Sequence, residues 1–155
     1  MTTKNIITLI VLVIIISTVA WFSGNKSKIE IPEVENVDMV PAITYNNSSI
    51  DLIAVDAPLP GDVVGGVFEV MGVARGYWFF EASFPVEIYD SNNSLLTTGI
   101  AQAQGDWMTE DFVPFSVNIA VPNNYTGPTT IVLRRDNPSG EPANDASVSF
   151  TVNIQ

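Results

Sequence analysis

The stretch ASVSFTVNI near the end of the chain alternates between polar and apolar side chains, and this period of two constrains the fold most. In an extended strand, alternate side chains point to opposite faces. One face would therefore carry the apolar side chains of Val148, Phe150, Val152 and Ile154. The same alternation recurs in PFSVNIAV and FPVEIYD, and no segment after residue 49 has the apolar stripe of an amphipathic helix. The sequence predicts half-buried β-strands.

About seven strands are expected, and residues that favour turns follow each of them. They cover residues 50–55, 66–75, 84–90, 95–102, 114–121, 129–135 and 146–154. The best hairpin signal is YDSNNSLL, in which asparagines tolerate a positive φ and acidic or hydroxyl side chains can bond to backbone amides. We therefore predict one all-β domain over residues 50–155, an antiparallel β-sandwich.

The most apolar segment is IITLIVLVIIISTVAWF, residues 6–22, with Lys4 before it and Lys26 and Lys28 after it. As a helix it would be about 25 Å long, near the lower limit for crossing a bilayer core. We predict that residues 1–22 form one transmembrane helix that anchors the chain. The alternative is a signal peptide that is removed after Ala20, and in both cases the remainder is exported.

Residues 23–49 mix acidic residues, prolines and an Asn/Ser cluster without a sustained period of 2 or 3.6. This composition predicts an acidic linker between the membrane and the β-domain. The linker and domain would lie outside the cytoplasm, with the chain as a single-pass membrane protein. The alternative location is the medium, after cleavage of the signal segment.

Composition excludes several classes of function. The chain has no histidine and no cysteine, so it lacks Ser-His and Cys-His nucleophile pairs, disulfides and the usual ligands of zinc. All 17 acidic residues lie at Glu30 or later, where only Arg75, Arg134 and Arg135 are basic. Such an acidic body lacks the basic patches that bind nucleic acid. We expect no cofactor, no metal and no enzymatic activity.

Two segments, RGYWFFEASFP and GDWMTEDFVPF, combine aromatic and acidic residues and contain most of the candidate site. The site residues are Trp78, Phe79, Glu81, Asp106, Trp107, Met108 and Asn137. They form either a structural loop cluster or a partner-binding surface. At strand spacing, Trp78 and Phe80 would share one face, and Tyr77, Phe79 and Glu81 the other.

In the second segment, the interpretation we favour places the apolar side chains in the end of the sandwich: Trp107, Met108, Phe112 and Phe115. The acidic residues would then bond to backbone amides of the loop. Two alternatives remain open. Asp106, Glu110 and Asp111 could bind calcium, or one of them could form a catalytic carboxylate pair with Glu81. A third segment, DNPSG, predicts a turn in which Gly140 takes a positive φ.

The order of these motifs resembles the immunoglobulin-like domain of bacterial spore germination. The motifs are P-x-x-G-D, G-x-A, W-x-F-E, G-D-W-M, P-F and N-P-S-G, at residues 58–62, 72–74, 78–81, 105–108, 114–115 and 137–140. The resemblance implies an Ig-like sandwich outside the bacterial cytoplasm, often in envelope proteins. It implies no established catalytic activity and supplies no catalytic residues.

The resulting hypothesis is a membrane-tethered, extracytoplasmic domain that binds or scaffolds an envelope protein or a glycan. The first alternative is a carbohydrate-binding or carboxylate-based hydrolytic module. It would use Glu81, Asp106, Glu110 and Asp111 with the rings of Trp78 and Trp107. A second alternative is an assembly subunit that pairs through an edge strand.

Overall fold

A computed structural model describes residues 42–155 of the chain. Within this range no helix is long and apolar enough to cross a membrane. The predicted membrane segment at residues 1–22, and most of the predicted linker, lie outside the described residues. The described residues all belong to one compact unit, Asp38–Gln155.

The described part is an all-β fold, as predicted, with two short 3₁₀ turns. Its strands are β1 (Thr44–Asn46), β2 (Ile53–Ala57), β3 (Val63–Val64), β4 (Val67–Arg75), β5 (Ser83–Tyr89), β6 (Leu95–Ala103), β7 (Phe112–Ala120), β8 (Gly127–Arg134) and β9 (Ser147–Ile154). The turns are η1 (Gly76–Trp78) and η2 (Pro142–Asn144). All the predicted strands are present, with ends shifted by a few residues. The two additional strands, β1 and β3, are too short to show a period in the sequence.

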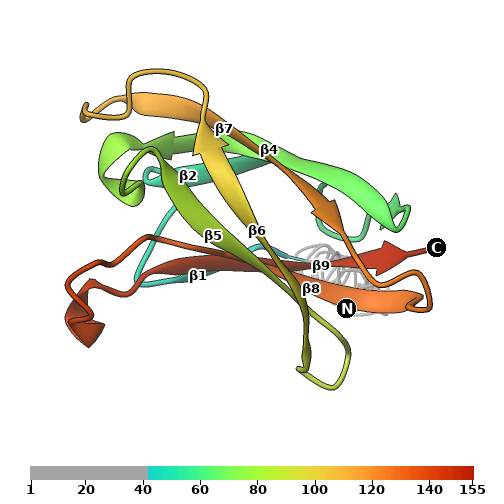
Figure 1. The fold of residues 1–155 in the computed structure, drawn as a ribbon. Coiled ribbons are helices and arrows are strands. Elements are labelled where there is room, and N and C mark those ends of the chain that lie inside the picture. Colours follow the sequence, from blue (N-terminus) through green and yellow to red (C-terminus); the bar gives the residue numbers. More distant parts are fainter. Residues whose placement is uncertain (1–41) are drawn as a thin grey trace, which may run out of the picture. The chain divides into compact units, whose positions relative to one another are not determined.

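The strands form two layers that are joined on one side (Figure 1). The hydrogen-bonded order is β1-β9-β8-β5-β6-β7-β4-β2, and β3 pairs with β9 in parallel. Strands β2, β4 and β7 form the first layer, and β1, β9 and β8 lie in the second. In the β5–β6 hairpin, the half of β5 nearest the turn pairs with β8 in the second layer. Strand β6 then returns to the first layer, where its end meets β7. The fold is therefore a β-sandwich with one closed corner.

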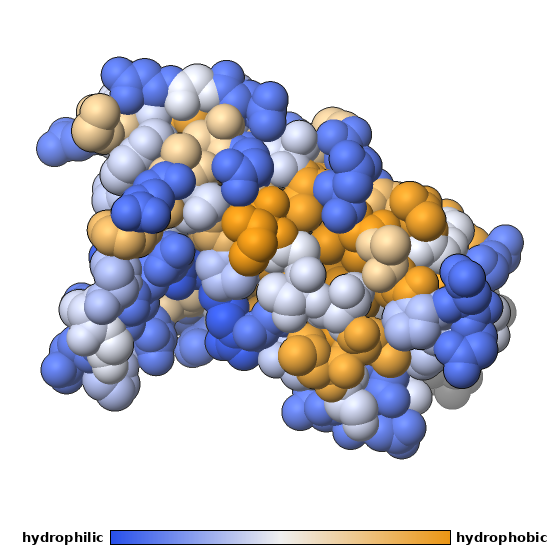
Figure 2. All heavy atoms as spheres, viewed as in Figure 1, coloured by the Kyte–Doolittle hydropathy of each residue, from blue (hydrophilic) through white to orange (hydrophobic). Residues whose placement is uncertain are grey.

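The hydrophobic core lies between the layers and takes the inward residues of every long strand. Its largest fully buried side chains include Trp78, Phe84, Phe115, Ile131 and Leu133. The predicted inward face of β9 is confirmed, because Val148, Phe150, Val152 and Ile154 are all buried. Apolar side chains also reach the surface on one side, over β6 and beside it (Figure 2).

The folded region begins before residue 50, where the sequence placed the start of the domain. Strand β1 pairs antiparallel with β9, and Tyr45 lies opposite Val148. The side chain of Tyr45 packs against the core. The end of the predicted linker, residues 44–46, therefore belongs to the sheet, because β9 offers an edge for it to pair with.

The two predicted turns are confirmed. In the β5–β6 hairpin, the Asp90 carboxylate accepts hydrogen bonds from the backbone amides of Asn92 and Ser94, both at 2.8 Å. Asn93 takes the positive φ, at 62°. In the later loop Gly140 has a φ of 64°, and its amide bonds to the carbonyl of Asn137.

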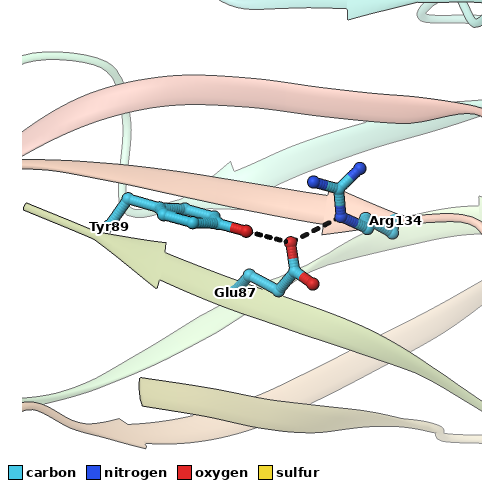
Figure 3. Close-up of polar contacts among 3 residues, drawn as sticks. All are labelled: Glu87, Tyr89 and Arg134. Carbon is cyan, nitrogen blue, oxygen red and sulfur yellow. Dashed lines mark hydrogen bonds and ion pairs between the residues drawn. The ribbon is translucent and has the colours of Figure 1, made fainter. Parts of the chain in front are cut away.

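A polar network ties β5 to β8 on the outer surface of the sheet (Figure 3). Glu87 Oε2 accepts hydrogen bonds from the Tyr89 hydroxyl, at 2.8 Å, and from Arg134 Nε. The hydrogen bond to Glu87 raises the pKa of the Arg134 guanidinium. These contacts hold the hairpin to the second layer at the point where it begins to cross.

Candidate functional site

Three chain segments meet at one end of the sandwich and form the candidate site, which we call the loop end. They are residues 47–52 before β2, η1 after β4, and the loop 104–111 between β6 and β7. The register of the first layer brings them together, since Arg75 at the end of β4 pairs with Phe112 at the start of β7. Ile53 at the start of β2 pairs with Ala74.

Arg75 links all three segments. Its Nε donates to the carbonyl of Asp51 at 3.0 Å, and its Nη1 donates to the carbonyl of Glu110 at 3.2 Å. Its guanidinium lies 4.0 Å from the centre of the Phe112 ring, a cation–π contact. Arg75 thus uses its charge to hold loop backbone in place.

Gly76 allows the loop between β6 and β7 to approach η1 closely. A Cβ atom at this position would lie 2.0 Å from the carbonyl oxygen of Thr109 and 2.3 Å from that of Trp107. No side chain fits at such distances. The Gly76 amide also donates to the carbonyl of Asp111. The backbone of the loop end is therefore packed tightly.

A shallow cavity of about 480 Å³ opens at this end. Asp51, Leu52, Arg75, Tyr77, Glu110 and Asp111 line it. The same segments expose apolar surface, since Tyr77 is 46% exposed and Met108 is 77% exposed. Phe80 and Phe112 are also exposed. The loop end thus presents aromatic and thioether side chains beside carboxylates on a fixed backbone.

The aromatic run in the first segment is arranged differently from the predicted strand. Trp78 and Phe79 are both buried and pack against Phe84, with ring centres 6.4 and 5.2 Å away, while Tyr77 and Phe80 are exposed. The predicted alternation is wrong because residues 76–78 form a 3₁₀ turn. The turn interrupts the alternation of an extended strand, so Trp78 and Phe79 no longer have to point to opposite faces.

The side chains of the second segment also separate into two groups. Phe115 is buried and Trp107 is half-buried against the core, as predicted. Met108 and Phe112 are exposed, so the prediction that they fill the end of the sandwich is wrong. The Asp106 carboxylate accepts from the Met108 amide at 3.0 Å, as predicted for an acid that stabilises its own loop. This turn directs Met108 away from the core.

The remaining candidates, Glu81 and Asn137, lie on turns. Glu81 is exposed with a φ of 50°. Asn137 Nδ2 donates to the carbonyl of Glu141 at 2.9 Å and to the Asp145 carboxylate at 2.8 Å. Asn137 therefore closes its own loop.

The arrangement gives little support to the chemical alternatives. Within residues 42–155 there is no group of three or more acidic side chains that could hold a metal. Trp78 has 0% exposure, so it cannot offer a ring face to a sugar. Glu81 and Asp106 do not line the cavity, whereas Glu110 and Asp111 do. The carboxylates expected to act together are thus divided between separate turns and the cavity wall.

Sequence reasoning missed Arg75 and Asp51 as site residues. Arg75 is one of three basic residues after residue 28, and that scarcity was the available signal. Asp51 had no such signal, because its place beside Glu110 depends on the β2–β4–β7 pairing.

The two-layer, mainly antiparallel sheet, the core tryptophan and the loop end define an immunoglobulin-like β-sandwich domain. Residues 52–154 match the family model of the immunoglobulin-like domain of bacterial spore germination, and the chain belongs to this family. Comparison with curated proteins and with solved structures gave no significant match.

Proposed function

We propose that the protein is a membrane-tethered, extracytoplasmic domain of the bacterial cell envelope that binds or scaffolds a partner and has no chemistry of its own. Membership of a bacterial Ig-like family supports the binding role, because Ig-like sandwiches present loops at their ends for recognition. The apolar segment at residues 6–22 supports the tether.

The observation that carries the proposal is the exposed apolar surface on a fixed loop end. Tyr77 and Met108 are largely solvent-exposed, while Arg75 and the close contact at Gly76 hold their segments. Aromatic anchors on a rigid backbone bind with little loss of conformational entropy. An envelope protein or a glycan could pack on such a surface, and the surrounding acidic residues disfavour nucleic acid and anionic lipid.

The test is a pull-down from solubilised envelope fractions with the purified unit 38–155. We expect the wild type to retain a specific partner and the double variant Tyr77→Ser/Met108→Ser to lose it. Val67→Ser is the matched control, because Val67 is an exposed apolar residue at the opposite end of β4. If the control and the double variant retain the same partner equally, the loop end is not the binding surface.

A further inference from the structure

Strand β6 has an open edge within residues 42–155. It pairs with β5 from Leu95 to Gln102, but with β7 only through Gln102 and Ala103. At Gly99 a Cβ atom would lie 2.5 Å from Ile119 Cδ1 and 2.8 Å from Val117 Cγ2. The side chains of β7 therefore lie over the inner face of β6. Residues 95–101 form an edge of the second layer.

This edge lacks the features that usually protect an edge strand. Natural edge strands carry charges, prolines or bulges that prevent pairing with another chain. The stretch LLTTGIAQAQG, residues 95–105, contains neither a charged residue nor a proline. Its one irregularity is a register shift at the hairpin, opposite Ile88 and Tyr89.

Apolar side chains are also exposed along this edge. Leu95 is 54% exposed and Ile100 is 52% exposed. Figure 2 shows hydrophobic surface gathered over β6 and beside it. An apolar surface beside an unpaired strand is the combination expected of an interface formed by strand pairing.

The other edges of the described sheet differ from β6. Strand β2 contains the exposed Asp56, and Pro58 follows its end. Strands β1 and β3, which lie along β9, are only 3 and 2 residues long. Short strands, charges and prolines limit pairing. In the described sheet, strand β7 also lacks a partner on its β6 side after Ser116, but only over the shorter stretch 117–120. Among the edges in residues 42–155, the stretch 95–101 of β6 is the longest without a charge, a proline or a partner strand.

We propose that β6 pairs with β6 of a second copy of this chain, in a twofold homodimer with one sheet continuing across the interface. An antiparallel pair with its axis at Thr98 sets Leu95 opposite Ala101, and every facing residue is uncharged. The choice of partner rests on charge. The chain is strongly acidic, so two copies repel over most of their surfaces, and this uncharged edge is where they can meet. A partner strand with basic side chains is not favoured, because β6 has no carboxylate with which they could pair.

The test is sedimentation equilibrium of the unit 38–155, which contains all nine strands and the described core. We expect a dimer that forms with increasing protein concentration. Added salt should strengthen it, because salt screens the repulsion between two acidic bodies. Thr98→Lys places two like charges on the axis and should give a monomer. The matched control Thr98→Val should remain a dimer, and circular dichroism checks that both variants fold.

Several results would overturn the proposal. A wild type that stays monomeric at every concentration and salt level excludes the dimer. A Thr98→Lys variant that dimerises like the wild type excludes β6 as the interface. A third contrary result could come from hydrogen exchange of the full chain in detergent micelles. If the amides of residues 97–100 are protected in the monomer, another part of the same chain covers this edge.

Discussion

Among single residues, direct neighbours in the sequence lie in very different environments in the fold. Trp78 is buried and anchors the core, whereas Tyr77 beside it is exposed at the cavity. Gly76, one position earlier, leaves room for the carbonyl oxygens of the loop between β6 and β7. The 3₁₀ turn thus separates a core residue from a surface residue within one short segment.

Gly76→Ala should destabilise the domain by about 1–3 kcal/mol, because the added methyl group overlaps the backbone of the loop and must displace it. Gly105→Ala, in the loop between β6 and β7, is the control. Its Cβ atom would have Val113 Cγ1 as its nearest neighbour, at an ordinary 4.0 Å. Urea denaturation measures the free energy of unfolding of both variants. Equal stability of the two would contradict the close contact at Gly76.

At the scale of elements, the short strand β1 depends on its partner. It has 3 residues and pairs only with β9 in the described sheet. Tyr45 secures it by packing against the core, and this burial raises the pKa of the Tyr45 hydroxyl above its ordinary value of 10.0. The stability that β1 contributes should therefore decrease at alkaline pH.

The sign follows from the direction of the pKa shift. The folded state keeps the Tyr45 proton to higher pH than the unfolded chain does, so the stabilisation is complete below pH 10 and is lost as pH rises above it. We expect the free energy of unfolding of the wild type to fall more steeply in this range than that of Tyr45→Phe. Denaturant titrations over a pH series measure the difference. Parallel pH profiles would show that Tyr45 does not contribute.

For the whole molecule, the proposed function gives the apolar segment and the β-domain separate roles. The segment at residues 6–22 would hold the chain in the membrane, and the domain would present the loop end and the β6 edge. These surfaces lie on different parts of the sandwich. The loop end is at the end of β4 and the start of β7, and the open edge lies along β6.

In bacterial cells, we expect the full chain to sediment with membranes and resist extraction by salt, because residues 6–22 are held by the hydrophobic core of the bilayer. Protease added to spheroplasts should digest the C-terminal domain. Deletion of residues 1–22 should move the protein to the soluble cytoplasmic fraction. A cytoplasmic marker protein serves as the control for intact cells. Protection of the domain until lysis would contradict the proposed orientation, and release of a chain starting at Trp21 would indicate signal cleavage.

The fold class, the long strands and the inward face of β9 were all predictable from the sequence. These features depend on alternation and on turn residues, which act within a few positions along the chain. The roles of Asp106 in its loop and Asp90 in its hairpin were also predictable, because each carboxylate bonds to an amide two residues later. The family was also recognisable, because each of its ordered motifs is a short run of neighbouring residues.

Three features follow from the packing of distant segments: which aromatic residues are buried at the loop end, where β1 joins the sheet, and which edge is open. Met108 is exposed because the Asp106 turn directs it outward, and Tyr77 because η1 replaces a strand. Arg75 meets Asp51 and Glu110 only through the pairing of β2, β4 and β7. The open edge of β6 arises where the hairpin crosses between layers. Each of these features depends on contacts between residues far apart in the chain. The alternation of polar and apolar residues within one segment does not predict such contacts.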